Sequence, residues 1–274
     1  MTTTTGMFTT SDHVELLTRS WTVDAPRYDI LLVHGLGEHS GRWDAPAARF
    51  NLDGANVYSY DLRGHGASGG ERVHLDEWAS LHRDIAEMAR ATAASSGRPW
   101  VLYGHSLGGL QSAGYLIDEC EPVPNIAVLS APAMIATRGI DTVLKLAASV
   151  LGSVTPTTSI NNKITGEQLS RDPAVGEAYF ADELVQTKAT ARFGKVTFAE
   201  QDRLRPRLGS ISIPTLVVHG ADDELVQPAA SAPLAASESV SRKVYPGVRH
   251  ELHNEPEGAE VLGDIIDWIN AKLF

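Results

Sequence analysis

Hydrophobic residues in this chain are grouped in short uninterrupted runs, and segments with helical spacing lie between them. Uninterrupted apolar runs are typical of strands that are buried on both faces, as in a parallel sheet. Apolar side chains recur instead at Trp78, Leu81, Ile85 and Met88, which is the spacing of one helix face. The alternation predicts an α/β fold with a doubly wound, mostly parallel sheet. The predicted strands are residues 30–33, 57–60, 100–103, 126–129, 215–218 and 243–245, and the predicted helices are 42–52, 75–94, a helix after residue 106, 228–236 and 259–273.

Two segments depart from this alternation. Residues 7–21 contain extended stretches around a turn at 11–13, which predicts an antiparallel hairpin at one edge of the sheet. From about residue 134 to residue 208 the pattern is helical and loop-like, with a polar, turn-prone stretch at 155–165. We interpret 134–208 as a helical cap inserted into a single domain of residues 1–274. It is expected at the carboxyl edge of the sheet, where ligands bind in such folds.

The cap contains apolar side chains with two possible roles. They either pack the cap against the core, which is the main expectation for most of them, or form an exposed patch that transiently contacts lipid aggregates or a membrane surface. These side chains are Val143, Leu144, Leu146, Ala147, Val150 and Leu151.

Composition restricts the partners and the compartment. The formal net charge of −11 disfavours nucleic acid and electrostatic attachment to an anionic membrane. Residues 1–11 lack the basic and apolar stretches of a secretory signal, and no apolar run reaches the length of a bilayer span. The single Cys120 excludes an intrachain disulfide, and Asp118 and Glu119 beside it disfavour a reactive thiolate. We therefore expect a cytoplasmic protein, with any membrane association peripheral, in which Cys120 is structural.

The candidate nucleophile is Ser106, which follows the predicted strand at 100–103. Gly104 and Gly108 flank it as G-x-S-x-G, the spacing that exposes a serine on a tight strand-to-helix turn. A Cβ at either glycine would collide with the adjoining strand or helix. Serine also favours an ordinary helix N-cap, but the preceding strand and the two glycines favour the nucleophile.

A serine hydroxyl needs a base to take its proton and an acid to orient that base. Asp222 and Asp223 follow the predicted strand at 215–218, and His250 follows the strand at 243–245. The order Ser, Asp, His is that of nucleophile-elbow hydrolases. His250 is therefore the candidate base, whereas spacing alone leaves both aspartates open as the acid.

The negative oxygen of a tetrahedral intermediate requires hydrogen-bond donors. The amide of Leu107 lies at the start of the predicted helix, where donors are unpaired. We assign the second donor to the amide of Leu36, in the loop that follows the strand at 30–33, because small neighbouring residues let this backbone approach a substrate.

Several motifs in this order resemble those of the monoacylglycerol lipases, serine aminopeptidase-like members of the α/β-hydrolase superfamily. The resemblance covers nearly the whole chain. The motifs are His34-Gly35-Leu36-Gly37-Glu38-His39-Ser40-Gly41-Arg42-Trp43, Asp61-x-Arg63-Gly64-His65-Gly66-x-Ser68, Gly104-His105-Ser106-Leu107-Gly108-Gly109, Ser130-Ala131-Pro132, Ser170-Arg171-Asp172-Pro173, Gly220-x-x-Asp223 and Gly247-x-x-His250-x-x-His253.

This resemblance implies an α/β-hydrolase fold and hydrolysis of the single ester of a monoacylglycerol through an acyl-enzyme, without a cofactor. It selects Asp223 as the acid, because the family's acid lies three residues after the glycine. It also implies that Glu38, Arg42 and His253 form a polar network near the glycerol end of the substrate. The i, i+4 spacing of the first two is equally compatible with an ordinary helix-surface ion pair.

Other functions remain as alternatives. A lysophospholipase would need basic residues for a phosphorylated head group, and the cap has no obvious Lys or Arg cluster. A broad-specificity carboxylesterase or a non-catalytic ligand-binding protein would share the same motifs. An aminopeptidase would need acids in the cap to hold a free amine, and the candidates are Asp172, Glu177, Asp182 and Glu183.

Neither a metal nor a nucleotide cofactor is expected. His250 and His253 have the spacing H-x-x-H, but the Glu-bearing helix of the known zinc motifs is missing. Gly35 and Gly37 follow a strand as in a dinucleotide fingerprint, but Ser40 occupies the place of the third glycine.

Overall fold

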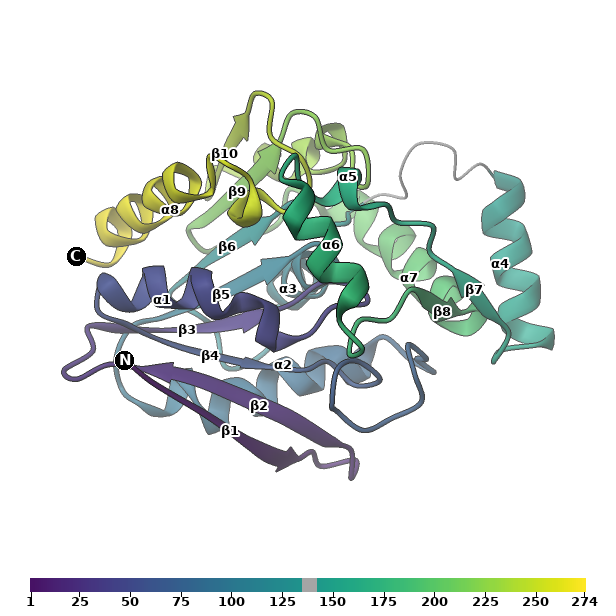
Figure 1. The fold of residues 1–274 in the computed structure, drawn as a ribbon, viewed down its shortest axis with the longest axis horizontal. Coiled ribbons are helices and arrows are strands. Elements are labelled where there is room, and N and C mark those ends of the chain that lie inside the picture. Colours follow the sequence, from purple (N-terminus) through teal and green to yellow (C-terminus); the bar gives the residue numbers. More distant parts are fainter. Residues whose placement is uncertain (135–141) are drawn as a thin grey trace.

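The computed structural model describes residues 1–134 and 142–274, with side chains for 1–134 and 148–274 (Figure 1). Eight strands form one twisted sheet in the order β1-β2-β4-β3-β5-β6-β9-β10. The strands are β1 (Thr2–Thr9), β2 (Glu15–Thr22), β3 (Tyr28–Val33), β4 (Ala55–Tyr60), β5 (Trp100–His105), β6 (Ile126–Ser130), β9 (Thr215–Gly220) and β10 (Val240–Tyr245). The six strands from β4 to β10 are mutually parallel, as the apolar runs predicted.

The predicted hairpin is confirmed at the sheet edge. β1 and β2 pair antiparallel over their full length, and β2 pairs antiparallel with β4. β1 is almost entirely exposed and begins at Thr2, before the expected residue 7. Its polar threonines lack an apolar side that would mark a strand in the sequence.

Helices cover both faces of the sheet. They are α1 (Asp44–Leu52), α2 (Ala79–Ala91), α3 (Leu107–Ile117) and α8 (Gly258–Leu273). Leu31 and Val33 of β3 pack with α2 and α3, whereas Ile30 and Leu32 pack with α1 and α8. Figure 1 shows α1 and α8 on the near face and α2 and α3 on the far face. This three-layer arrangement explains why β3 carries no polar alternation.

Two predicted helices differ in the structure. The 75–94 helix begins only at Ala79, although Leu75 and Trp78 are buried in the preceding loop. The segment expected as one helix at 228–236 forms two 3₁₀ turns, η4 (Pro228–Ala230) and η5 (Ala232–Ala236). Pro233 lacks the backbone N–H that the interior of a continuous helix requires, which accounts for the break.

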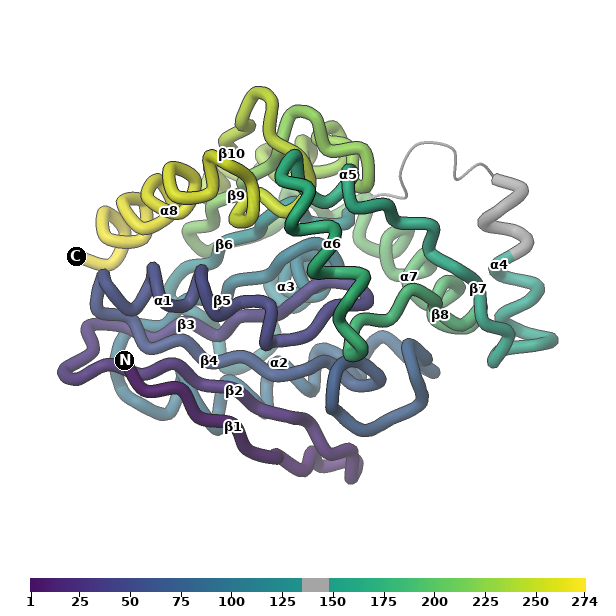
Figure 2. The backbone as a smooth tube through the Cα atoms, in the orientation of Figure 1, coloured from purple at the N-terminus to yellow at the C-terminus, as the bar shows by residue number. Residues whose placement is uncertain are grey.

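The segment between β6 and β9 lies beside the carboxyl ends of the parallel strands (Figures 1 and 2). Its elements are α4 (Thr142–Val154), β7 (Ser159–Asn161), α5 (Gly166–Leu169), α6 (Pro173–Ala181), β8 (Lys188–Thr190), α7 (Ala191–Leu204) and η3 (Arg205–Arg207). β7 and β8 form a separate antiparallel pair, so the turn-prone 155–165 stretch contains a strand that the sequence did not indicate. β7 is only three residues long and exposed, too short for a periodic signal.

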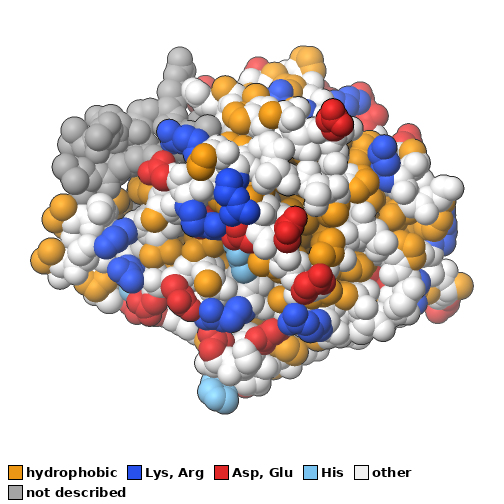
Figure 3. Space-filling model, turned by 180° about the vertical axis from the view of Figure 1, so that it is seen from behind, with side chains coloured by type: hydrophobic (Ala, Val, Ile, Leu, Met, Phe, Trp, Pro, Cys, Tyr) orange, Lys and Arg blue, Asp and Glu red, His pale blue; other side chains and the backbone are white. Residues whose placement is uncertain are grey.

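Ion pairs and loop contacts join this segment to the rest of the molecule. Basic and acidic side chains are intermingled on the face shown in Figure 3. Arg203 of α7 binds Asp118, at the end of α3, with a shortest distance of 2.6 Å. The amide of Gln186 donates to the carbonyl of Gly37 at 2.7 Å, and Asp182 lies 2.8 Å from His39 Nε2. Among the described helices, none is long and apolar enough to cross a lipid bilayer.

Candidate active site

Ser106 occupies the sharp turn between β5 and α3. Its φ of 52° and ψ of −114° lie outside the regions that non-glycine residues normally adopt. Three backbone hydrogen bonds hold this conformation: Ser106 N donates to Ser130 O at 2.9 Å, and Ser106 O accepts from Leu110 N and Ala133 N, each at 3.0 Å. The strain presents the Oγ at the end of the strand rather than within the helix.

The two flanking glycines are required by close backbone contacts. A Cβ on Gly104 would overlap the carbonyl oxygen of Gly108, and a Cβ on Gly108 would overlap the carbonyl of Val33. The elbow therefore permits α3 to start directly against β3 and β5.

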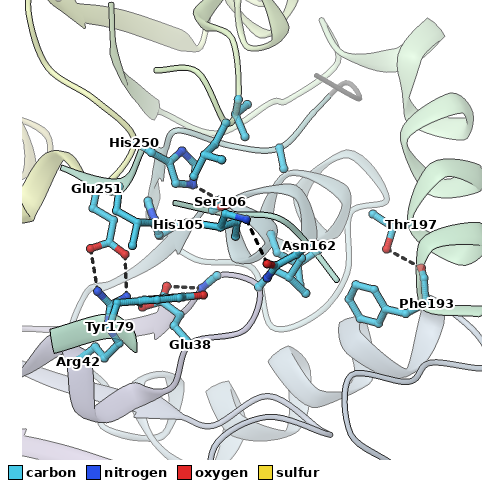
Figure 4. A pocket seen from close by; sticks show the side chains of 18 of the residues that line it. Glu38, Arg42, His105, Ser106, Asn162, Tyr179, Phe193, Thr197, His250 and Glu251 are labelled. Carbon is cyan, nitrogen blue, oxygen red and sulfur yellow. Dashed lines mark hydrogen bonds and ion pairs between the residues drawn. The ribbon is translucent and has the colours of Figure 1, made fainter. Parts of the chain in front are cut away.

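The structure brings Ser106, His250 and Asp223 together although they are far apart in the chain. Figure 4 shows the imidazole of His250 directed toward Ser106. His250 Nε2 lies 2.9 Å from Ser106 Oγ, and His250 Nδ1 lies 2.7 Å from Asp223 Oδ2. A carboxylate only accepts hydrogen bonds, so Nδ1 carries the ring proton and Nε2 is free to accept the serine proton. This is the geometry of a nucleophile, a base and an orienting acid.

Asp223 rather than Asp222 is the partner of His250. Its Oδ1 accepts from the amides of Leu225 and Val226 at 2.9 and 2.8 Å. Burial raises the pKa of Asp223, but the charge of His250 and the hydrogen bonds outweigh burial and hold the pKa well below its usual range. Asp222 is exposed to solvent.

His250 is buried, and its charge state depends on two opposing effects. Burial lowers the pKa of the imidazole, whereas the charge and hydrogen bond of Asp223 raise it; the net result is a pKa above the ordinary value. Asp223 therefore stabilises a proton added to the imidazole of His250.

Leu36 and Leu107, whose backbone amides are the candidate oxyanion donors, both lie near Ser106. Leu107 is the first residue of α3, and Leu36 follows β3; both residues line the same cavity as Ser106. Glu38 Oε1 accepts from the amide of Gly35 at 2.6 Å, which fixes the loop that carries Leu36. A Cβ on Gly35 would lie only 3.1 Å from Ser106 Cβ, so this loop needs glycine to approach the nucleophile.

A charged cluster borders the cavity next to this loop (Figure 4). Arg42 donates from both terminal nitrogens to Glu251, at 2.7 and 2.8 Å, and from Nη1 to Glu38 Oε2 at 3.1 Å. Glu38 Oε2 also accepts from Trp43 Nε1 at 3.2 Å. Arg42 and Glu38 are thus part of a buried three-residue cluster and not an isolated helix-surface pair.

Glu251 was not singled out from the sequence. It directly follows His250, and this adjacency is the only signal that pointed to it. Burial raises the pKa of Glu251, but the Arg42 guanidinium lowers it by more. The net pKa lies below the ordinary value, so the carboxylate stays ionised.

His253 lies beside the cluster without a hydrogen bond to it. Its ring stacks on Trp43 with centroids 4.0 Å apart, and within the described part of the chain neither ring nitrogen has a hydrogen-bond partner. Burial lowers the pKa of His253 to about 4, so the ring is neutral at pH 7. His253 does not belong to the cavity lining either.

The cavity above Ser106 has a volume of about 250 Å³. Its walls come from the loops that follow the sheet strands and from the segment between β6 and β9. Most of the lining side chains are apolar, and the charged cluster lies on one side. Tyr179 of α6 stacks over Arg42, with the guanidinium carbon 4.8 Å from the ring centroid. The described apolar lining residues are Leu36, Leu107, Ala133, Ile164, Leu169, Phe193, Phe198, Leu225 and Val226.

The acids considered for an amine site lie elsewhere. Asp172 caps α6 by accepting from the amide of Ala174 at 3.0 Å, and Asp182 binds His39. The carboxylates in the described cavity lining are Glu38 and Glu251, both engaged by Arg42. Within residues 1–134 and 148–274, no group of three His, Cys, Asp or Glu side chains is arranged to hold a metal ion.

Comparisons with known proteins identify the relatives of this chain. Residues 24–257 match the family model described as serine aminopeptidase, S33. The monoacylglycerol lipase of Mycolicibacterium smegmatis is 38% identical over 262 residues, which are 92% of each chain. Human monoglyceride lipase is 30% identical, over 96% of this chain and 89% of its own.

Solved structures show the same fold. The monoacylglycerol lipase of Paleococcus ferrophilus superposes with a TM-score of 0.85 at 29% identity, covering 94% of this chain and 99% of that one. A soluble variant of monoglyceride lipase from Saccharomyces cerevisiae, in complex with a substrate analogue, superposes with a TM-score of 0.89 at 20% identity, covering 100% and 96%. The sequence relatives and the parallel sheet with its sharp serine turn lead to one conclusion: this chain belongs to the monoacylglycerol lipase family of the α/β-hydrolase superfamily.

Proposed function

We propose that this protein is a serine carboxylester hydrolase that cleaves monoacylglycerols to a fatty acid and glycerol. The observation that carries the proposal is the 2.9 Å contact between His250 Nε2 and Ser106 Oγ at the edge of a largely apolar cavity. In this proposal Ser106, Asp223 and His250 are the catalytic triad, and the amides of Leu36 and Leu107 are the oxyanion hole.

Acylation begins when Ser106 Oγ attacks the ester carbonyl carbon. His250 Nε2 takes the serine proton as the new C–O bond forms, and Asp223 stabilises the resulting imidazolium. The carbonyl oxygen becomes negative and accepts hydrogen bonds from the amides of Leu36 and Leu107. His250 then donates its proton to the glycerol oxygen as the ester C–O bond breaks, which releases glycerol and leaves the acyl group on Ser106.

Deacylation repeats these steps with water as the nucleophile. His250 accepts a proton from water while the water oxygen attacks the acyl carbonyl, and the same two amides stabilise the oxyanion. The proton returns from His250 to Ser106 Oγ as the acyl–serine bond breaks and the fatty acid leaves.

The lining of the cavity supports a lipid with an uncharged head group. Apolar side chains such as Leu169 and Phe193 suit an acyl chain, whose burial is favourable. The charged cluster provides a polar end, but the guanidinium of Arg42 is bonded to both Glu38 and Glu251. With two carboxylates against one guanidinium, this end disfavours a phosphate and suits the hydroxyls of glycerol.

We also propose that residues 134–208 act as a cap over this cavity and that the cap contacts lipid surfaces. Several large apolar side chains of this segment are exposed. A single exposed apolar residue needs no explanation, but several in one segment are typical of a surface that contacts lipid or protein. Those exposed in the described part of the cap are Val150, Leu151, Val154, Ile160, Phe180 and Leu184. The side chains of Val143, Leu144, Leu146 and Ala147 lie outside the described residues.

The test is hydrolysis by the purified protein and by Ser106→Ala, with Ser241→Ala, an exposed serine of β10, as the matched control. Substrates are a monoacylglycerol series, a lysophospholipid, a short-chain aryl ester and an aminoacyl amide. We expect the monoacylglycerols to be the preferred substrates and their hydrolysis to be lost only in Ser106→Ala. Undiminished hydrolysis by Ser106→Ala contradicts the triad; preference for the lysophospholipid or the amide contradicts the substrate.

A further inference from the structure

His219 is a fully buried histidine on β9 that the steps above do not use. Its Nε2 lies 2.7 Å from the carbonyl oxygen of Val226 and 3.2 Å from Asp223 Oδ2. A carbonyl oxygen can only accept a hydrogen bond, so Nε2 must carry a proton. That N–H is shared between the carbonyl and the carboxylate of the triad acid.

The other side of the ring is also held. His219 Nδ1 lies 2.8 Å from Ser231 Oγ, which also lies 3.1 Å from the carbonyl oxygen of Pro228. Ser231 Oγ in turn accepts from Arg242 Nε at 3.2 Å, and Arg242 belongs to β10. The imidazole is therefore held by the segment between β9 and β10, at Val226 on one side and at Ser231 on the other.

His219 completes the hydrogen bonding of the Asp223 carboxylate. A carboxylate offers about four acceptor positions. Oδ1 takes the amides of Leu225 and Val226, and Oδ2 takes His250 Nδ1 and His219 Nε2. Without His219, Oδ2 would be held by His250 alone, the group that it has to orient.

We propose that His219 is a positioning residue for this reaction: its Nε2–H fixes Asp223 Oδ2 to β9, and the fixed carboxylate in turn sets the orientation of His250. The inference rests on the proposed function, because it assumes that Ser106, His250 and Asp223 catalyse ester hydrolysis. A residue that acts through Asp223 affects the chemical step. A residue that only supports the loop would displace Leu225 and Val226, which line the cavity, and would affect substrate binding.

Two amide substitutions separate these roles. In His219→Gln the amide nitrogen is three bonds from Cβ, as Nε2 is, so the donor to Asp223 is retained. In His219→Asn the amide is two bonds from Cβ, at the level of Nδ1, so the contact with Ser231 is retained and the donor to Asp223 is lost. The half-buried His82 of α2, changed to Asn, controls for replacing a packed histidine by an amide.

The readouts are kcat and KM for a monoacylglycerol and the second-order rate of labelling by a small fluorophosphonate. We expect His219→Asn to lower kcat and the labelling rate by roughly tenfold, the scale of one hydrogen bond to a charged group, with little change in KM. His219→Gln is expected to restore both rates to within about threefold of the starting protein. His82→Asn is expected to leave them unchanged.

Three results overturn the proposal: unchanged kcat in His219→Asn, an effect confined to KM, or equal impairment in His219→Gln and His219→Asn. If His219→Asn does not fold, Ser231→Ala replaces it, because it loosens the ring and should lower kcat in the same direction; an unchanged kcat there overturns the proposal as well. Failure of the proposed function is recognised separately, since hydrolysis by the unsubstituted protein would then persist in Ser106→Ala.

Discussion

Arg42 and Glu251, which are 209 residues apart in the sequence, form a two-pronged ion pair with N–O distances of 2.7 and 2.8 Å at the wall of the cavity. Both side chains are nearly inaccessible to solvent. The pair therefore connects the loop after β3 to the loop that carries His250, and it holds His250 relative to the loop that carries Leu36.

Removing Arg42 is expected to destabilise the fold strongly. Arg42→Ala leaves the carboxylates of Glu38 and Glu251 buried without a cation, which costs about 3–5 kcal/mol in comparable buried pairs. Urea unfolding measures the change in the free energy of unfolding. The matched control is Arg205→Ala, which breaks an exposed ion pair with Asp202 and should cost less than about 1 kcal/mol. Equal losses in the two variants would contradict a stabilising role for the cluster.

The two neighbouring aspartates are expected to respond differently to the same substitution. Asp223→Asn removes the carboxylate that holds the His250 tautomer, and in triads of this kind the loss in kcat is about 10⁴-fold. Asp222→Asn alters an exposed side chain and should leave kcat within about twofold. Steady-state kinetics of the two variants decide the assignment, and a larger loss in Asp222→Asn would reverse it.

The pH dependence of kcat/KM is expected to have an acid limb set by His250. The imidazole must be neutral to accept the serine proton, so activity falls by about tenfold per pH unit below its pKa. Burial lowers that pKa, but Asp223 outweighs burial and raises it, so the limb lies above the value of about 6.5 of a free imidazole. A pH–rate profile with circular dichroism at each pH measures this, and a limb well below that value contradicts the expected coupling to Asp223.

Two glycine-to-alanine substitutions are expected to have opposite effects. Gly108→Ala places a methyl group against the carbonyl oxygen of Val33, so we expect loss of activity and lower stability. Gly263→Ala adds a methyl group to α8 with nothing within 4 Å, and alanine should stabilise that helix by about 0.5–1 kcal/mol. Thermal unfolding and ester hydrolysis of both variants test this. A fully active Gly108→Ala would show that the elbow tolerates more space than its backbone contacts indicate.

The sheet could be predicted from the sequence because its strands are buried on both faces. Ile30 to Val33 have no polar positions, and the structure buries alternate members of this run under different helices. The β7–β8 pair could not be predicted, since its strands are only three residues long and give no periodic signal. The predicted helix wrongly included Leu75 and Trp78, which are buried in a loop. Their apolar spacing reflects burial, and burial alone does not distinguish a helix from a packed loop.

For the site, Ser106 and His250 were recognisable because each follows a strand that ends at the same edge of the sheet. The choice of Asp223 over Asp222 came from a resemblance rather than from spacing. His219 and Glu251 were missed for a physical reason: their contacts depend on how separate loops meet, as in the approach of Glu251 to Arg42, and a single sequence does not carry that information.

The hydrogen bond from Gln186 to the carbonyl of Gly37 has a consequence for engineering. It attaches the chain between α6 and β8 to the same loop that supplies the Leu36 amide, and a Cβ on Gly37 would overlap the carbonyl oxygen of Gln186. The segment between β6 and β9 therefore cannot be exchanged independently of the rest of the molecule. A chimaera that carries the corresponding segment of a relative would have to bring its own version of the 34–42 loop, or lose the placement of the Leu36 amide, the proposed oxyanion donor.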